Sequence, residues 1–347
     1  MNFYSILITW YQKNMRVLPW RNTNDPYPIW LSEIILQQTR VQQGLPYYES
    51  FLKQFPKVSD LARASQDEVL KLWEGLGYYS RARNLHEAAK YIHEELNDVF
   101  PGDYKSLLTL KGVGPYTAAA VASFAFGEQI AVVDGNVYRV LARIFGLEMD
   151  ISSSKAHNYF QNIAQNLLEE GEDPALFNQA IMDFGAMQCT PKNPLCETCP
   201  FEAQCVAKAD NKINILPVKL SKTKVIDRYF DYIITQDTDQ KYVVNQRLTS
   251  GIWQNLFEFP LIENAVKLPL ETVEEQIKLE YTTYDIQQLF AFDSEYQVHK
   301  LSHQRLYIRF WKLEVGDNLK GYDKDCLLNF AYPIVLVNFI QKNWLKI

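Results

Sequence analysis

The sequence predicts a multidomain protein of the α and α+β class, with an all-helical first domain and an α/β second domain. Up to about residue 205, apolar residues recur at spacings of three and four, which is the pattern of helices with one buried face. From about residue 228, short runs of aromatic and β-branched residues predominate, as in strands. The 347 residues, 47% of them hydrophobic, suffice for two hydrophobic cores.

The clearest elements follow from these patterns in chain order. The first domain, residues 1–208, is predicted to contain helices at 30–36, 68–73 and 156–168. Residues 209–227 contain Pro217 and many lysines, which predict an extended, solvated connector. The second domain, residues 228–347, is predicted to contain strands at 229–234, 241–244 and 305–311 and a helix at 273–281.

Composition excludes several classes of protein. A net charge of −6 argues against a general polyanion binder, although a total conceals local patches. No apolar run approaches the length of a transmembrane helix. The N-terminal Ile6-Leu7-Ile8 is too short for a signal peptide and is soon followed by Lys13 and Arg16. We therefore expect a soluble, cytoplasmic protein with no membrane partner.

A glycine-rich turn stands at residues 110–118, which read Leu-Lys-Gly-Val-Gly-Pro-Tyr-Thr-Ala. Gly112 and Gly114 permit a tight turn, and Pro115 suits the first turn of a helix. Backbone N–H groups at such a helix start can bind a DNA phosphate without a basic side chain. The alternative is an ordinary helix start, followed one helix later by an Asx-type turn at Asp134-Gly135.

Four cysteines lie close together, at Cys189, Cys196, Cys199 and Cys205. Disulfides are unexpected in an intracellular chain, so this spacing predicts a metal site. Both tetrahedral zinc and a [4Fe–4S] cluster suit four thiolates, and the spacing alone does not choose between them. Cys326 stands apart in an apolar context and is expected to be a small core residue.

The turn, Asp134 and the cysteine spacing together resemble the helix-hairpin-helix DNA glycosylases related to endonuclease III. The resemblance sharpens to the adenine DNA glycosylase (MutY) family through four strings, at residues 18–21, 30–39, 75–85 and 177–180. It implies a helix-hairpin-helix at 105–120, one [4Fe–4S] cluster held in an iron-sulfur loop at 189–205, and a Nudix-like α/β sandwich at 228–347. It also implies a monomer, associated with the nucleoid if the source is bacterial.

Glu33 and Asp134 are the candidate catalytic pair. Cleavage of the bond between adenine and deoxyribose requires an acid on the base side and a carboxylate facing an oxocarbenium-like sugar. Glu33 lies among apolar residues, where desolvation raises a carboxyl pKa and keeps it protonated towards adenine N7. Asp134, beside Asn136 and near a helix start, is expected to stay ionised. The alternative for Glu33 is an exposed helix glutamate.

Tyr116 stands where relatives of endonuclease III carry a Schiff-base lysine. A phenol cannot form an imine, so we expect hydrolysis by water without strand cleavage. The resemblance further implies that Tyr116 helps to hold Asp134 and the sugar. An aromatic side chain packed beneath the turn is the alternative.

Excision from a duplex requires the adenine to be flipped out of the stack. By resemblance, Gln38 and Tyr78 fill the gap beside the unpaired base, Leu76 packs at the same step, and Arg21 and Gln179 bind the edge of the adenine. The remaining residues expected to contact DNA are Thr39, Gly112, Val113, Gly114 and Lys192. Each of these residues has a role in the core or in a helix cap as its alternative.

No complete Arg-Glu-x-x-Glu-Glu cluster follows Gly251, so we expect the second domain not to be a working nucleotide hydrolase. A recognition role is therefore favoured. Ser302 and His303 can donate and accept hydrogen bonds, as a reader of 8-oxoguanine requires. The family has Phe-Ser-His here, and this chain has Leu301 in place of Phe. The alternative is a plain hairpin turn before the strand at 305–311.

The sequence thus predicts a base-excision repair enzyme that removes adenine paired with 8-oxoguanine or guanine in double-stranded DNA. Two other functions remain open. A pyrimidine glycosylase with lyase activity, as in endonuclease III, is disfavoured by Tyr116. A non-catalytic iron-sulfur DNA-binding regulator is disfavoured by the pairing of Glu33 with Asp134.

Overall fold

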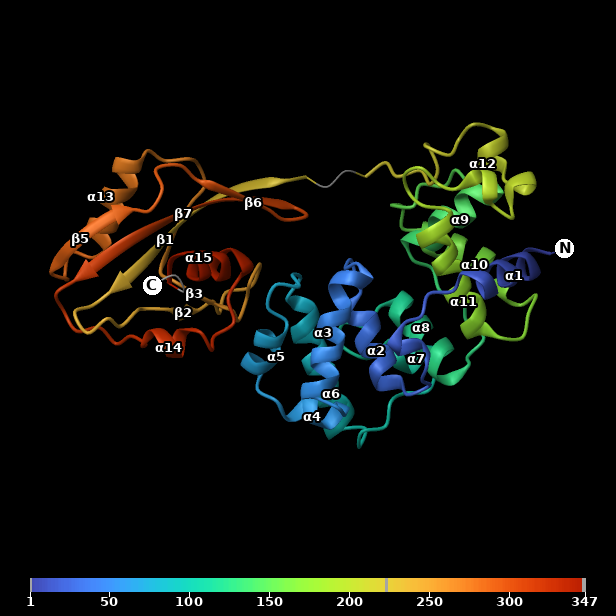
Figure 1. The fold of residues 1–347 in the computed structure, drawn as a ribbon, viewed down its shortest axis with the longest axis horizontal. Helices are drawn as coiled ribbons and strands as arrows, with labels where there is room; N and C mark the ends of the chain where they lie inside the picture. Colours follow the sequence, from blue (N-terminus) through green and yellow to red (C-terminus); the bar gives the residue numbers. More distant parts are fainter. Residues whose placement is uncertain (1, 222–223, 345–347) are drawn as a thin grey trace. The chain divides into compact units, whose positions relative to one another are not determined.

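The computed structural model describes residues 2–221 and 224–344 and divides into two compact units (Figure 1). Unit 1 comprises residues 1–63 and 84–221. Unit 2 comprises residues 64–83 and 222–347. Segment 64–83 therefore belongs to the same unit as the C-terminal part of the chain, although it lies between helices of unit 1 in the sequence.

The regular elements that the structure describes in unit 1 are all helical. They are α1 (Phe3–Asn14), η1 (Pro19–Arg21), α2 (Pro26–Ile35), α3 (Val41–Gln54), α4 (Val58–Arg63), most of α6 (Ser80–Glu94), α7 (Tyr104–Leu107), α8 (Pro115–Phe126), α9 (Gly135–Phe145), α10 (Ala156–Leu168), α11 (Pro174–Asp183), η2 (Phe184–Gln188), η3 (Cys196–Thr198), η4 (Glu202–Gln204) and α12 (Val206–Ala209). Helix η2 is a single π-helical turn that continues α11.

The core of unit 1 is organised around α8. Its alanines at 118–120 and 122 are buried, and these small side chains let α2 and α11 pack closely against it. Aspartates cap three helices that carry predicted site residues or lie beside them: Asp25 begins α2, Asp134 begins α9, and Asp173 begins α11. Each accepts a backbone N–H that the helix itself cannot satisfy, which fixes where the helix starts.

Unit 2 is built on a five-stranded mixed sheet. Its elements are α5 (Gln66–Leu72), the first turn of α6, β1 (Ile226–Gln236), β2 (Asn245–Gln246), β3 (Phe257–Glu258), β4 (Leu261–Asn264), α13 (Leu270–Glu280), β5 (Ile286–Ala291), β6 (Gln297–Lys300), β7 (Gln304–Val315), α14 (Lys324–Leu327) and α15 (Ile334–Trp344). The order is β4-β1-β7-β5, with β6 also paired to β7. Strands β1 and β7 are parallel, with Asp231 opposite Arg309, and the other pairs are antiparallel.

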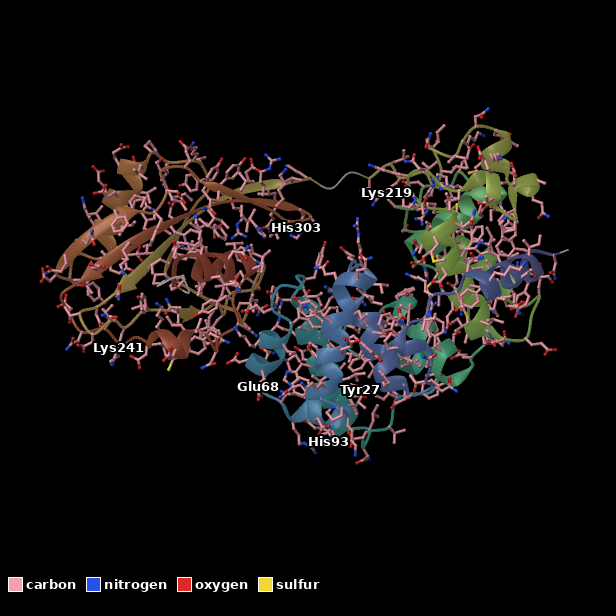
Figure 2. The ribbon with its side chains drawn as sticks, in the orientation of Figure 1. Tyr27, Glu68, His93, Lys219, Lys241 and His303 are labelled. Carbon is pink, nitrogen blue, oxygen red and sulfur yellow. The ribbon has the colours of Figure 1, made fainter. Side chains whose placement is uncertain are left out.

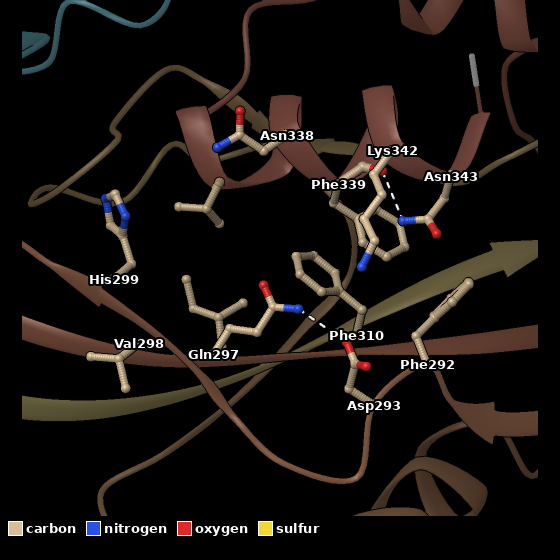
Figure 3. A pocket seen from close by; sticks show the side chains of 12 residues that line it. Phe292, Asp293, Gln297, Val298, His299, Phe310, Asn338, Phe339, Lys342 and Asn343 are labelled. Carbon is tan, nitrogen blue, oxygen red and sulfur yellow. Dashed lines mark hydrogen bonds between the residues drawn. The ribbon is translucent and has the colours of Figure 1, made fainter. Parts of the chain in front are cut away.

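Helices cover both faces of this sheet. Trp311 packs in one cluster with Val273 and Ile277 of α13, whereas the ring of Phe310 stacks on that of Phe339 of α15 at 4.0 Å. Because successive side chains of a strand point to opposite faces, α13 and α15 lie on opposite sides of β7. The predicted α/β sandwich is therefore confirmed. A cavity of about 300 Å³ lies between α15 and the β6–β7 hairpin (Figure 3).

Most of the predicted elements are confirmed, and two local predictions are wrong. The helix at 156–168 coincides with α10, and the strand at 305–311 lies within β7. Residues 241–244 do not form a strand, because only Tyr242 pairs, with Gln236 on one side and Tyr322 on the other. Cys326 is exposed rather than in the core, because the single turn of α14 directs Leu327 inward instead.

Part of the predicted connector packs against unit 1. Leu216 is buried in unit 1, where its carbonyl accepts a hydrogen bond from Arg143 Nε at 3.1 Å. The carbonyl of Val218 accepts one from the backbone of Ile151 at 3.0 Å. Residues up to 221 thus form part of unit 1. No helix within residues 2–221 and 224–344 combines the length and apolarity that a membrane crossing needs.

Candidate active site

Glu33 lies in the last two turns of α2 with only 6% of its surface exposed. Trp30, Leu31 and Ile34 are buried around it, so the apolar string that surrounds it in the sequence also surrounds it in space. Burial raises the pKa of Glu33 to about 7, and the charge of Asp134 acts in the same direction. A hydrogen bond from the Tyr116 hydroxyl to Oε2, at 2.7 Å, partly opposes this rise.

The glycine turn places Tyr116 opposite Glu33. Gly112 has φ 75°, and a Cβ at this position would stand 2.6 Å from Cβ of Asn84, so only glycine fits. Gly114 then caps α8 and Pro115 occupies its first position, which puts Tyr116 in the first turn. Burial raises the pKa of the Tyr116 phenol well above its usual value. The phenol therefore stays neutral and donates its hydrogen to Glu33.

Asp134 is the N-cap of α9, and its carboxylate accepts three hydrogen bonds. Oδ1 accepts from the backbone N–H groups of Asn136 and Val137, both at 2.8 Å, and Oδ2 accepts from Asn136 Nδ2 at 2.7 Å. Burial raises the pKa of Asp134, while these bonds and the charge of Arg139 act to lower it. Both oxygens thus serve as acceptors, which is the arrangement of a carboxylate.

Arg139 connects this aspartate to the cysteine loop, a connection that the sequence analysis did not identify. Its Nη2 donates to Asn136 Oδ1 at 2.8 Å and to the Gly185 carbonyl at 2.6 Å, and its Nε donates to the Cys189 carbonyl at 2.7 Å. A Cβ on Gly185 would stand 2.6 Å from Cβ of Asn136, so this glycine permits the close approach. One buried guanidinium therefore links the partner of Asp134 to the first cysteine.

Arg21 and Gln179, the predicted adenine-binding residues, are held by residues that the sequence analysis missed. Arg21 donates through both Nη atoms to the fully buried Asp183, at 2.7 and 2.8 Å. Asp183 also accepts from Arg16 Nη2, at 2.5 Å, and from Arg16 Nε, at 2.8 Å. Gln179 Oε1 accepts from the Tyr11 hydroxyl at 2.9 Å. The charge of Arg21 acts on Glu33, whose pKa it lowers.

The residues predicted to contact DNA differ in exposure. Gln38 in unit 1 and Tyr78 in unit 2 are both exposed and both have positive φ, of 57° and 48°. Such backbone conformations are costly for these residue types and are commonest at functional sites. Leu76 and Val113 are instead buried, at 4% and 7% exposure. Of the others, Lys192 is exposed and Thr39 is half-buried.

Ser302 and His303 form the exposed turn between β6 and β7, so the hairpin expected as the alternative is present (Figure 2). Ser302 Oγ lies 3.0 Å from Nδ1 of His303. A cavity of about 480 Å³ within unit 2 is lined by this turn, by Trp253 and by Tyr78 with its flanking glycines. The structure thus brings together Tyr78 and the two predicted lesion-reading residues.

All four cysteines of the 189–205 run line one small cavity. Within the described residues, no three Cys, His, Asp or Glu side chains converge on a position for a single metal ion. Four thiolates on one cavity are a ligand set that suits either one zinc ion or a [4Fe–4S] cluster. Arg143 lies beside this set, with Nη1 3.5 Å from Sγ of Cys189 and donating to the Thr190 carbonyl at 2.7 Å.

Comparisons with known proteins identify the families that the two parts of the chain match. Residues 31–166 match the profile of the HhH-GPD superfamily of base excision DNA repair proteins, and residues 231–342 match the NUDIX domain. An adenine DNA glycosylase of Buchnera aphidicola subsp. Schizaphis graminum is 32% identical over 307 residues, which cover 88% of this chain and 86% of that protein. The human adenine DNA glycosylase is 44% identical over 215 residues, which cover 59% of this chain and 39% of that protein.

Solved structures match the helical part. A thermostable thymine-DNA glycosylase superposes with a TM-score of 0.56 at 32% identity, covering 60% of this chain and 95% of that one. An endonuclease III in a non-covalent DNA complex superposes with a TM-score of 0.51 at 20% identity, covering 60% and 95%. At that identity, the second similarity establishes the fold alone.

Proposed function

The chain belongs to the adenine DNA glycosylase family, whose members are hydrolases acting on N-glycosyl bonds, and we propose that it excises adenine paired with 8-oxoguanine or guanine in duplex DNA. The observation that carries this proposal is the buried Glu33, hydrogen-bonded to Tyr116 and within electrostatic range of Asp134. The site thus combines a proton donor, Glu33, with a carboxylate, Asp134. These are the two groups that N-glycosyl hydrolysis requires.

In the proposed mechanism, Glu33 protonates adenine N7 and Asp134 stabilises the sugar cation. Tyr116 donates to Oε2 of Glu33, which leaves Oε1 to carry the proton that is transferred to the base. Asn136 and the start of α9 hold the Asp134 carboxylate in place as positive charge develops on the sugar. The bond between the sugar and adenine N9 breaks, and its electron pair leaves with the protonated base. Water then adds to the sugar cation and gives up a proton, which restores the acid form of Glu33. Because Tyr116 cannot form an imine, the product is an abasic site in an intact strand.

Base flipping completes the proposal. Gln38 and Tyr78 are exposed on strained backbone, as side chains that enter a duplex must be, and we assign them to the gap that the adenine leaves. Arg21 and Gln179 are assigned to the adenine pocket. Leu76, which is 4% exposed in this structure, is assigned with Tyr78 to the step beside that gap.

Incubation with duplexes carrying adenine opposite 8-oxoguanine, guanine or thymine tests the function directly. Adenine should be released from the first two, and the strand should break only after treatment with alkali. Strand breakage without alkali, or release of a damaged pyrimidine, would indicate an endonuclease III-type enzyme. Binding without release of any base would indicate a DNA-binding regulator.

The rate of excision should depend on pH through Glu33. With its pKa near 7, Glu33 is mostly protonated below pH 7 and loses its acid form above it. Single-turnover rates measured from pH 5 to 9 should therefore fall as the pH rises through about 7. Glu33→Gln should be slow and should lack this decline. A flat wild-type profile between pH 6 and 8 would remove Glu33 from its role as the acid.

We propose that Cys189, Cys196, Cys199 and Cys205 hold one [4Fe–4S] cluster. Their common cavity suits such a cluster, and thiolates are its usual ligands. Hydrolysis involves no electron transfer, so the cluster would supply structural support to the cysteine loop, which also carries Lys192. Through its carbonyl contact with Arg139, Cys189 would extend this support to Asn136.

The purified protein should accordingly show broad visible absorbance and about four irons per chain. Cys199→Ser should lose iron and should weaken folding and DNA affinity before it affects chemistry, because metal binding and folding are coupled. Cys326→Ser, at an exposed cysteine outside the loop, is the matched control and should retain full iron content. Stoichiometric zinc without iron in protein prepared anaerobically would contradict the assignment.

Ser302 and His303 are proposed to read the base opposite the adenine. In 8-oxoguanine, N7 carries a hydrogen and C8 an oxygen, whereas N7 of guanine is an acceptor. The Ser302 hydroxyl can donate or accept a hydrogen bond, and each nitrogen of the His303 imidazole can do either according to the tautomer. The turn can therefore bind both N7–H and the C8 oxygen of 8-oxoguanine. The two side chains are already within hydrogen-bonding distance of each other at the cavity that Tyr78 also lines.

Replacing Ser302 and His303 together by alanine should therefore reduce the preference for 8-oxoguanine over guanine. The expected loss is that of one or two hydrogen bonds, about 1–3 kcal/mol. Excision opposite guanine serves as the internal reference and should change much less. Equal losses on both duplexes in a rate comparison would show that these residues only stabilise the turn.

A further inference from the structure

The segment 64–83 carries Tyr78, and its polar contacts explain why it belongs to unit 2. At its start, Gln66 Oε1 accepts a hydrogen bond from Asn255 Nδ2, and Asp67 Oδ1 accepts one from Gln246 Nε2 at 3.1 Å. Helix α5 is thereby joined by side chains to the region around β2 and β3. Both contacts lie in the first turn of α5 and hold the start of the helix in place.

At the end of α5, two side chains bind the backbone just before α15. Lys71 Nζ donates to the carbonyl of Phe330 at 2.9 Å, and Glu74 Oε1 accepts from the backbone N–H of Tyr332 at 2.9 Å. Lys71 and Glu74 also form an ion pair at 3.1 Å. Because one partner in each backbone contact is ionised, these are charge-assisted hydrogen bonds, which are stronger than neutral ones.

The loop that follows α5 and carries Tyr78 is also hydrogen-bonded to the backbone of Tyr332. The hydroxyl of Tyr79 accepts from the backbone N–H of Gly75, at 3.2 Å, and donates to the carbonyl of Tyr332, at 3.3 Å. Tyr332 is therefore bound on both its N–H and its carbonyl by residues on either side of the Tyr78 loop. Arg83 Nη1 donates to the Gln254 carbonyl at 2.9 Å, which fixes the far end of the segment.

Within the loop, Gly77 and Arg81 set the direction of Tyr78. The Gly77 carbonyl accepts from Trp73 Nε1 at 3.0 Å and from Arg81 Nη2 at 3.2 Å. The Arg81 guanidinium lies 5.5 Å from the centroid of the Tyr78 ring and 5.1 Å from that of Trp73. The Tyr78 ring thus has a defined orientation in the loop. The loop in turn is held in position by the hydrogen bonds to the Tyr332 backbone.

We propose that Glu74 is a positioning residue for recognition of the base opposite the adenine. Through Tyr332 it fixes the Tyr78 loop, which forms one wall of the cavity whose other wall is the Ser302–His303 turn. Both walls then belong to one unit, so their separation does not depend on how the two units approach DNA. This inference rests on the proposed reading of that base by the turn.

Glu74→Ala tests the inference, with excision efficiency measured opposite 8-oxoguanine and opposite guanine. The ratio of the two should fall about tenfold, as expected for loss of a charge-assisted hydrogen bond, because the loss opposite 8-oxoguanine should exceed any loss opposite guanine that follows from the role of Tyr78 in base flipping. Glu68→Ala is the matched control, because Glu68 caps the same helix through Ser65 only. It should leave the ratio unchanged.

Hydrogen exchange provides a readout independent of catalysis. Amides 75–79 should exchange faster in Glu74→Ala than in the wild type, and Glu68→Ala should show no such change there. Lys71→Met loses the contact with Phe330 and the ion pair with Glu74 but keeps the hydrogen bond between Glu74 and Tyr332. It should lower the ratio less and serves if Glu74→Ala does not fold. An unchanged ratio or an unchanged exchange rate in Glu74→Ala would overturn the inference. If the wild type itself does not discriminate between the two bases, the proposed reading of the lesion fails instead.

Discussion

Replacing Asp134 by asparagine is expected to lower the rate of adenine excision by roughly 10²-fold or more while DNA binding is retained. The amide has the shape of the carboxylate and can still cap α9 through its oxygen. It lacks the charge that stabilises an oxocarbenium-like sugar, and its NH2 group meets the NH2 of Asn136 where an acceptor stood. Single-turnover kinetics and a separate binding titration distinguish the two effects.

Asp173→Asn is the matched control for this substitution. Asp173 caps α11 by accepting the backbone N–H of Leu176 at 2.9 Å, so the change weakens a comparable cap outside the site. Its excision rate should stay close to that of the wild type. A near-normal rate in Asp134→Asn would show that Asp134 is only a helix cap, which is the alternative that its sequence context allows.

The catalytic group could be predicted because its geometry follows from local sequence. The apolar residues next to Glu33 are neighbours on one short helix, so burial of that carboxyl follows from the pattern itself. The glycines and Pro115 likewise determine where α8 starts and therefore where Tyr116 lies. What the pattern could not give is the 2.7 Å contact between two residues that are 83 positions apart.

The remaining contacts depend on how distant segments pack. The carboxylate of Asp183 accepts hydrogen bonds from arginines more than 160 positions away. The sequence around Asp183 does not indicate these partners. The helix at 66–72 was predictable from its spacing, but an amphipathic helix does not specify which core it joins. The burial of Leu76 has the same origin, since it depends on the fold of the loop around it.

Removal of the Asp183 carboxylate is expected to cause the largest loss of stability, about 3–5 kcal/mol for Asp183→Ala. Asp183 is fully buried, and the Arg21 side chain that it binds is only 10% exposed. Without the carboxylate, the guanidinium of Arg21 would be left in a largely buried site without its anion. Urea unfolding of the variant and the wild type at pH 7 measures the difference. Arg63→Ala, which removes an exposed ion pair with Asp60, should cost at most about 1 kcal/mol.

The difference in unfolding free energy between the wild type and Asp183→Ala should depend on pH. This dependence separates the contribution of the Asp183 charge from that of its packing. Burial would raise the pKa of Asp183, but the hydrogen bonds and charges of Arg21 and Arg16 hold it below its usual value. A carboxyl whose pKa is lowered on folding stabilises the protein above its unfolded pKa of about 4, and this contribution is lost as the pH falls further. The gap between wild type and Asp183→Ala should therefore narrow below about pH 4. A gap that stays constant on acidification would mean that the alanine variant is destabilised by a cavity, and that the two arginines do not depend on the charge of Asp183.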